Sequence, residues 1–305
     1  MPKGAVVMSQ VTIDTVEDDA RTYTRRWLQA GDIAYATLKD GTRVRYVRSG
    51  EGPDLVLTHT VRTQLDIFQF VIPLLSRHFT VYALDLPGFG WSDLLPERPK
   101  DEPTLRAQLK DFLQVLGLRR PILAGESIGA TLSLSLAAEL GDGVDRVVAF
   151  NTYDYLPGLE RANLLASVII KSVRAPLIGP VFAATENRSI TGGILKGGFA
   201  DPRKLPDDLL DEISRVGMRR DYGKGMRRLL KALPSFVAAR SRYGAIKAPV
   251  TLVWGERDWS SHEDRAGVER SMPAPEVITL ADTGHFSALE RPQDWASIII
   301  SAAKN

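Results

Sequence analysis

A serine between two glycines is the strongest chemical signal in the sequence. The pentapeptide Gly-Glu-Ser-Ile-Gly at 125–129 follows the apolar run 121–124 and precedes a segment, from Ala130, that is typical of a helix. A strand that turns at once into a helix strains the backbone at the serine, and side chains at the two glycine positions would collide with neighbouring chain. We therefore predict that Ser127 is a nucleophile held at the sheet edge, with free helix N–H groups beneath a developing oxyanion.

A serine hydroxyl needs a base, and the chain has four histidines that could supply it. His285 follows a predicted strand that ends at Leu280, whereas the other three are His59, His78 and His262. The order serine, acid, histidine favours His285 as the base, and an ordinary surface-loop histidine is the alternative interpretation.

The acid that orients the imidazole is expected at the end of another strand between the serine and the histidine. Asp258, just after the predicted strand 250–254, is the first choice. Glu256 and Asp154 stay open as alternatives, while Asp282 is disfavoured because it is close in sequence to the histidine. A plain turn residue is the other interpretation of Asp258, since Asp is common after strands.

The elements that must position these residues alternate between strands and helices, which is typical of a parallel sheet covered on both faces. The chain opens with a predicted hairpin, 33–38 and 43–47, joined at Asp40-Gly41. Further strands are predicted at 55–57, 79–84, 122–124, 144–150, 250–254 and 277–280, with helices at 105–116, 130–140, 263–272 and 295–303. The strand signal disappears between Tyr155 and Tyr243, where helices are predicted at 164–173, 209–218 and 226–233. The expected organisation is a leader at 1–30, an α/β core at 31–154 and 244–305, and a helical cap inserted at 155–243.

Composition narrows the class of partner. The chain has 305 residues, a net charge of +2 and no cysteine, so it has no overall field for nucleic acid and no thiolate chemistry. The Gly-Phe-Gly at 88–90 lacks the third glycine of a dinucleotide loop, and His-Glu-x-x-His is absent, so neither a cofactor nor a metal is predicted. A small-molecule substrate is expected, a homodimer is left open, and the lack of a signal peptide favours the cytoplasm. The longest apolar region, 162–184, is interrupted by charges and prolines and is a poor membrane span.

With these residues, the sequence resembles the capped serine hydrolases of the α/β-hydrolase superfamily. That group contains esterases, lactonases, carbon–carbon bond hydrolases and cofactor-free perhydrolases. The resemblance covers nearly everything after residue 30 and includes the loop 85–93, which is similar to the loop after the family's fourth strand. It implies an oxyanion hole formed by the backbone N–H groups of Val61 and Ile128. Relatives that open epoxides or cleave carbon–halogen bonds use Asp as the nucleophile, so Ser127 disfavours those reactions.

The sequence departs from the family at Thr60, where a β-branched residue replaces the glycine of a His-Gly pair. Because glycine adopts positive φ at little cost and threonine does not, the loop is expected to take another conformation or to supply its donor differently. Arg62, Thr63 and Gln64 are the nearby polar groups that could compensate.

The predicted cap has two different halves. Its first half is strongly apolar, and the stretch 215–231 carries seven cations against the single anion Asp221. A solvated face is one interpretation of these cations; an arginine that binds a substrate carboxylate is another, and a membrane-surface role is a third. The predicted function is a serine hydrolase of a small to medium, partly apolar carboxylic ester, lactone or related acyl compound. The alternatives are a carbon–carbon hydrolase of a ring-cleavage-type diketone and a weakly catalytic ligand-binding protein on the same fold.

Overall fold

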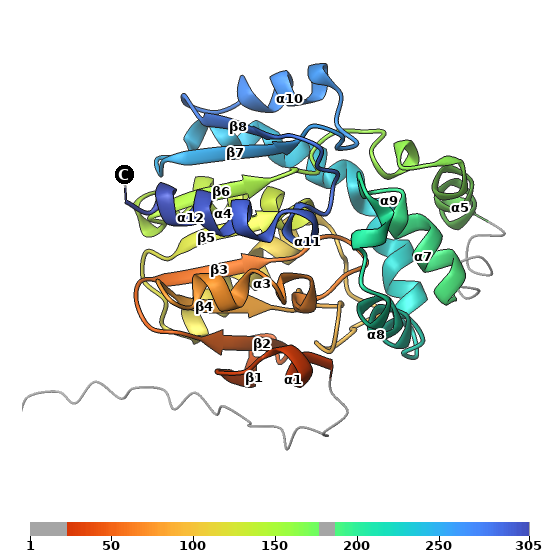
Figure 1. Ribbon diagram of the computed structural model, residues 1–305, viewed down its shortest axis with the longest axis horizontal. Helices are drawn as coiled ribbons and strands as arrows, with labels where there is room; N and C mark the ends of the chain where they lie inside the picture. The colour runs from red at the N-terminus through yellow and green to blue at the C-terminus, as the bar shows by residue number, and fades with distance from the viewer. Residues whose placement is uncertain (1–22, 177–186, 305) are drawn as a thin grey trace, which may run out of the picture.

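An eight-stranded sheet organises the computed structural model, which describes residues 23–176 and 187–304 (Figure 1). The strands are β1 (Asp32–Thr37), β2 (Arg43–Ser49), β3 (Asp54–Thr58), β4 (Thr80–Leu84), β5 (Ile122–Glu126), β6 (Arg146–Phe150), β7 (Val250–Gly255) and β8 (Glu276–Leu280). Their order is β1-β2-β4-β3-β5-β6-β7-β8; the pairs β1–β2 and β2–β4 are antiparallel, and all the others are parallel. The predicted hairpin and mostly parallel α/β sheet are confirmed.

Strand burial explains why the central strands are continuous apolar runs. All five residues of β4 and all five of β5 are buried, because helices cover both faces of a parallel sheet. The last strand, β8, lies at the edge and buries only Leu280 fully.

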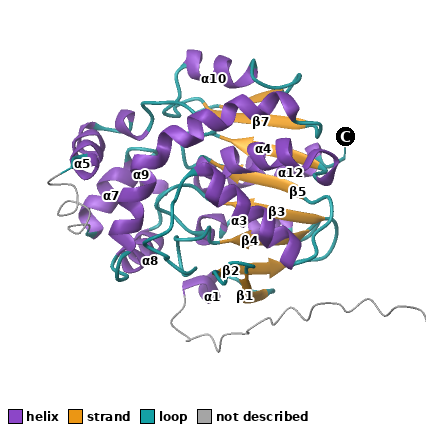
Figure 2. Cartoon of the chain, turned by 180° about the vertical axis from the view of Figure 1, so that it is seen from behind, coloured by secondary structure: helices purple, strands orange, loops and turns teal. Residues whose placement is uncertain are grey.

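Helices cover the sheet in two layers. On one face α3 (Glu102–Val115) packs against α4 (Ile128–Leu140), as the view from behind shows (Figure 2). On the other, α12 (Pro292–Ala302) packs against α2 (Ile72–Leu75) and α11 (Ser287–Glu290) (Figure 1). Beside the sheet edge lies α10 (His262–Glu269), which begins with a capping box at Ser261 and Asp264.

The segment between β6 and β7 is helical. Its helices are α5 (Leu164–Arg174), α7 (Arg188–Lys196), α8 (Asp207–Gly217) and α9 (Tyr222–Ala239), which gather beyond one end of the strands (Figure 1). The sequence predicted three of these and missed α7, whose residues include the helix-disfavouring pair Gly192 and Gly193. Part of the predicted apolar half of the cap, 177–182, lies outside the described residues. Across residues 23–176 and 187–304, none of the helices combines the length and the apolar character that crossing a bilayer requires.

Short elements complete the described chain. They are α1 (Tyr23–Trp27) and the 3₁₀ turns η1 (Leu65–Phe68), η2 (Gly141–Gly143), η3 (Leu159–Arg161), η4 (Pro202–Lys204) and η5 (Arg240–Ala245). Most of the predicted leader, residues 1–22, lies outside the described residues.

A buried arginine joins the antiparallel hairpin to the parallel strands. Arg45 of β2 donates to Asp85 Oδ2 from Nε at 2.7 Å and to Asp66 Oδ2 from Nη2 at 2.9 Å. Thr24 of α1 donates to the other Asp66 oxygen at 2.6 Å. Gly90 is required beside this cluster, because it has φ +49° and a Cβ there would lie 2.1 Å from Asp85 Oδ2. The cluster fixes the loop after β4 against the hairpin.

Candidate active site

The predicted elbow between β5 and α4 takes the strained backbone form that its glycines imply. Ser127 follows β5 directly, precedes α4 and has φ 61° and ψ −123°. A Cβ on Gly125 would lie 2.3 Å from Thr58 Oγ1, and one on Gly129 would lie 2.3 Å from the Thr58 carbonyl oxygen. Real side-chain contacts are never this close, so β3 can approach the turn only because both positions are glycine.

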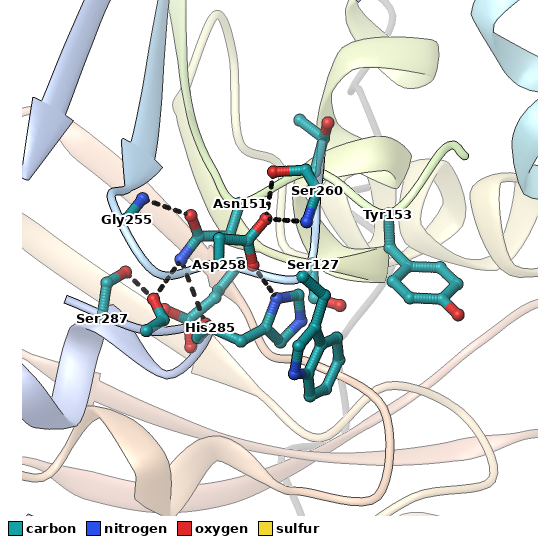
Figure 3. Close-up of polar contacts among 12 residues, drawn as sticks. Ser127, Asn151, Tyr153, Gly255, Asp258, Ser260, His285 and Ser287 are labelled. Atoms are coloured by element: carbon teal, nitrogen blue, oxygen red, sulfur yellow. Dashed lines mark hydrogen bonds and ion pairs between the residues drawn. The ribbon is translucent and has the colours of Figure 1, made fainter. Parts of the chain in front are cut away.

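The imidazole of His285 is paired with Asp258. His285 Nδ1 lies 2.5 Å from Asp258 Oδ1, and both side chains are fully buried (Figure 3). The other carboxylate oxygen accepts from Ser260 through its N–H at 3.0 Å and its hydroxyl at 2.5 Å. Burial alone would raise the pKa of Asp258, but the imidazole and the Ser260 hydrogen bonds outweigh it and lower that pKa. The carboxylate is therefore charged, and it favours the tautomer in which Nδ1 carries the proton.

Within the described part of the chain, Thr60 Oγ1 and Glu126 Oε2 are buried without a hydrogen-bond partner. The same is true of Ser127 Oγ and His285 Nε2. Both residues adjoin Tyr153, whose N–H lies 3.3 Å from the Ser127 carbonyl oxygen and whose ring centroid lies 6.4 Å from that of the imidazole. Buried polar atoms are rarely left unpaired, and catalytic hydrogen bonds are often long before substrate binds. The unpaired atoms of Ser127 and His285 are a hydroxyl that can donate a hydrogen bond and an imidazole nitrogen that can accept one.

The alternative acids have other partners. Glu256 accepts from the Asp282 N–H at 3.0 Å, and Asp282 pairs with Arg257 at 2.7 Å. Asp154 lies four residues beyond the end of β6 rather than closing the strand, and Thr152 Oγ1 donates to it at 2.9 Å. Burial raises the pKa of Asp154 to about 6. Among the candidate acids, Asp258 is the one hydrogen-bonded to the imidazole in the described structure.

The loop after β3 carries the expected oxyanion residues without strain at Thr60. The positive φ of this loop falls on Arg62 at 60°, and Thr60 is not among the described residues with positive φ. Val61 is buried there, and Ile128 is the first residue of α4, where an N–H has no acceptor within the helix. The loop thus takes a conformation that needs no glycine at position 60.

His59 is a structural residue of the same loop. Its Nε2 accepts from the Leu86 N–H at 2.9 Å, so the proton is assigned to Nδ1, which donates to the Thr60 carbonyl at 2.8 Å. Burial lowers the pKa of His59, in keeping with a neutral ring. The imidazole ties the loop after β3 to the loop after β4.

Asn151 is a site residue that the sequence reasoning missed. It follows β6 directly with φ 46° and accepts from the Gly255 N–H at 2.7 Å. Its amide nitrogen donates to the carbonyls of Gly284 and His285, at 3.1 Å each. Figure 3 shows this amide between the end of β7 and the histidine loop. A polar residue placed immediately after a buried strand was the available signal.

Glu126, one position before Ser127, is a second residue that the sequence did not predict for the site. Its Oε1 accepts from Ser287 Oγ at 2.6 Å and from the Ala288 N–H at 3.1 Å. Burial raises its pKa to about 8, although both hydrogen bonds favour the carboxylate. Glu126 thereby ties the elbow to the residues that follow His285.

The cations of 215–231 are largely bound to protein groups. Arg219 donates to the Ser92 carbonyl at 3.0 Å, and the guanidinium of Arg215 lies 4.7 Å from the centre of the Trp91 ring. Further pairs are Lys224 with Asp221 at 2.7 Å, Arg228 with Glu97 at 2.6 Å, and Arg227 with the Val173 carbonyl at 3.0 Å. These contacts fasten α8 and α9 to neighbouring parts of the chain. In the described ranges no three His, Asp or Glu side chains form a group that could hold a metal ion.

Comparison with known proteins defines the family. The model of the alpha/beta hydrolase family matches residues 55–298, and the chain belongs to that family. An uncharacterized protein of Mycobacterium tuberculosis is 25% identical over 284 residues, which cover 88% of this chain and 81% of that protein. The pimeloyl-acyl-carrier protein methyl ester esterase of Nitrosospira multiformis is 25% identical over 274 residues, 85% of this chain and 98% of the esterase. The solved enol-lactonase of Burkholderia xenovorans LB400 has a TM-score of 0.74 at 23% identity and covers 89% of this chain and 100% of its own. The predicted superfamily is confirmed, and the chain is a hydrolase with the α/β-hydrolase fold.

Proposed function

We propose that the protein is a serine hydrolase of small to medium, partly apolar carboxylic esters, lactones or related acyl compounds. The observation that carries the proposal is the pair of unpaired buried atoms, Ser127 Oγ and His285 Nε2, together with the hydrogen bond from His285 Nδ1 to Asp258. A serine hydroxyl and a neutral imidazole nitrogen are the donor and the acceptor that nucleophilic catalysis by a serine uses.

The reaction proceeds through an acyl-enzyme. Ser127 Oγ attacks the carbonyl carbon while His285 Nε2 takes its proton, and Asp258 stabilises the imidazolium that forms. The N–H groups of Val61 and Ile128 are the proposed donors to the oxyanion. Return of the proton to the leaving oxygen releases the alcohol, and water activated by His285 then frees the acid and restores the serine.

The methyl ester esterase among the relatives supports ester chemistry, whereas family membership supports a hydrolase without choosing among these substrates. The diketone reaction is favoured where a cap arginine binds the substrate, but Arg215, Arg219, Arg227 and Arg228 all contact protein groups. We further propose that 155–243 forms the cap over the site on the core 31–154 and 244–305, and that 1–30 is a leader. A cytoplasmic location, a homodimer and the lack of a cofactor stay predictions.

A fluorophosphonate tests the proposal because it phosphonylates only an activated serine. We expect a single adduct in the intact mass of the wild type, mapping to Ser127 by peptide analysis and lost in Ser127→Ala and His285→Ala. A folded wild type without an adduct would overturn the proposal and favour the ligand-binding alternative. If the adduct forms on Ser127, turnover rates of esters, lactones and diketones would show which of these substrate classes the enzyme prefers.

A further inference from the structure

An indole lies flat against the imidazole of His285. The rings of Trp259 and His285 are stacked with centroids 3.7 Å apart and an interplanar angle of 16°. Trp259 is the residue after Asp258, and only 7% of its surface is exposed. Asp258 thus binds Nδ1 of His285, and Trp259, the next residue in the sequence, covers one face of the imidazole ring.

The tryptophan is held by a glycine pair just beyond α7. Trp259 Nε1 donates to the Gly197 carbonyl at 3.3 Å, and the His285 N–H donates to the Gly198 carbonyl at 2.6 Å. A Cβ on Gly198 would lie 2.4 Å from Phe286 Cε2 and 2.9 Å from Trp259 Cζ2. Position 198 therefore has no room for a side chain while the indole lies on the imidazole.

We propose that Trp259 is a positioning residue for His285, and that the Gly197–Gly198 segment keeps its indole stacked on the imidazole. This inference rests on the proposed serine hydrolase mechanism and adds to it. The stack fixes the plane of the imidazole, so that Nδ1 stays on Asp258 while Nε2 faces the reacting atoms. It also stabilises the imidazolium formed during acylation, because the face of an indole attracts a cation.

Replacing the indole separates orientation from simple packing. In Trp259→Leu we expect kcat for an aryl ester to fall roughly 10- to 100-fold with little change in KM, since a misplaced base loses rate rather than binding. The acid limb of the kcat/KM–pH profile also moves, because the imidazolium loses its aromatic partner and the ring loses part of its burial. Trp259→Phe keeps a flat aromatic ring, so we expect it to restore most of kcat and most of the wild-type position of the acid limb.

Trp27→Leu is the matched control, because it makes the same change away from His285. Trp27 donates to Asp66 at 2.9 Å, in the buried cluster around Arg45. This control variant should leave kcat and the acid limb at their wild-type values. Wild-type kcat and an unmoved acid limb in Trp259→Leu would overturn the proposal, as would a Trp259→Phe variant no better than Trp259→Leu.

A second variant acts on the stack from its other side and covers the case in which Trp259→Leu fails to fold. A Cβ at position 198 would meet the Phe286 ring first and the indole next, so Gly198→Ala disturbs both rings that contact the imidazole and should reproduce the fall in kcat and the moved acid limb. Gly193→Ala is its control, because a Cβ there would come near only the tip of the Leu165 side chain. Equal, wild-type-like activity in both variants would contradict a role for the glycine segment.

A spectrum recorded without substrate distinguishes failure of this proposal from failure of the hydrolase proposal. With four histidines in the chain, the imidazole nitrogens of His285 can be assigned in ¹⁵N-histidine-labelled protein by comparison with His285→Gln. We expect these nitrogen signals to report one tautomer, with Nδ1–H donated to Asp258, in the wild type and to lose this single tautomer in Trp259→Leu. Identical nitrogen signals in the two proteins would overturn the stacking proposal. Different signals, with no fluorophosphonate adduct on the wild type, would overturn the hydrolase proposal alone.

Discussion

Glu126 and Ser287 are joined by a buried hydrogen bond of 2.6 Å that spans 161 positions of the sequence. It connects the residue before Ser127 to a residue two positions after His285. Because burial raises the pKa of Glu126 to about 8, the uncharged carboxylic acid is its favoured form at neutral pH. The connection is therefore sensitive to pH.

Stability should fall as pH rises because of Glu126. Its pKa rises from 4.5 to about 8 on folding, so its contribution is complete below about pH 4.5 and is lost as pH approaches 8. The pKa of Asp154 rises from 3.8 to about 6 on folding, so this residue also makes stability fall as pH rises, over a lower pH range. Urea unfolding between pH 5 and pH 9 should show that Glu126→Gln removes the decline of the free energy of unfolding between about pH 6 and pH 8. The exposed control Glu51→Gln should keep it; a wild-type slope in Glu126→Gln would contradict this account.

Ser127→Ala should lower kcat for short aryl esters roughly 10⁴-fold or more, because no other group supplies the attacking oxygen. Alanine inherits the positive φ of the serine, so we expect circular dichroism and Tm to match the wild type. The exposed Ser241→Ala provides the matched control. Retained turnover in Ser127→Ala would remove this serine from the mechanism.

Asp258→Asn should lower kcat by about 10³- to 10⁴-fold, because an amide in place of the carboxylate favours the wrong imidazole tautomer. Asp154→Asn, a buried replacement of the same kind, should stay near the wild-type kcat. Initial rates of both purified variants measure the difference. The reverse ranking would assign the acid to the loop after β6.

Asn151→Ala should lower the free energy of unfolding by about 2–3 kcal/mol, because it leaves buried backbone groups of Gly255, Gly284 and His285 unpaired. A fall in kcat should accompany it, since the histidine loop loses its amide support. Asn187→Ala removes the cap of α7 and should cost about 1 kcal/mol without an effect on kcat. Urea titration and ester turnover test both; equal behaviour of the two variants would argue against a role in the site.

Thr60→Val should keep full activity and change the free energy of unfolding by less than about 1 kcal/mol. The Thr60 hydroxyl is buried and has no partner in the described residues, and valine has nearly the same shape. Steady-state kinetics and urea unfolding are the measurements. A tenfold loss of kcat would mean that this hydroxyl contacts the transition state.

Local patterns were sufficient to predict the sheet and the elbow. The short apolar runs of β3 and β5 and the glycines on both sides of Ser127 each meet a requirement that a few neighbouring residues reveal. Thr60 predicted that the loop after β3 takes another conformation or supplies its donor differently, but the sequence did not predict that the positive φ lies two residues later, at Arg62.

Contacts between distant segments could not be predicted in this way. Asn151, Trp259 and Gly198 lie in three separate segments of the sequence. Nothing in the residues next to each of them indicates that the three meet at one site. Their meeting at His285 depends on how β6, β7 and the chain beyond α7 converge, which no periodicity encodes.

The buried cluster around Arg45 bears on how the molecule comes apart. Without the hairpin, Asp66 and Asp85 would lose their shared counter-charge, and a buried charge without its partner is strongly unfavourable. Unfolding of the β1–β2 hairpin while the rest of the sheet stays folded is therefore disfavoured. The hairpin and the parallel strands should therefore exchange their amide hydrogens as one cooperative unit.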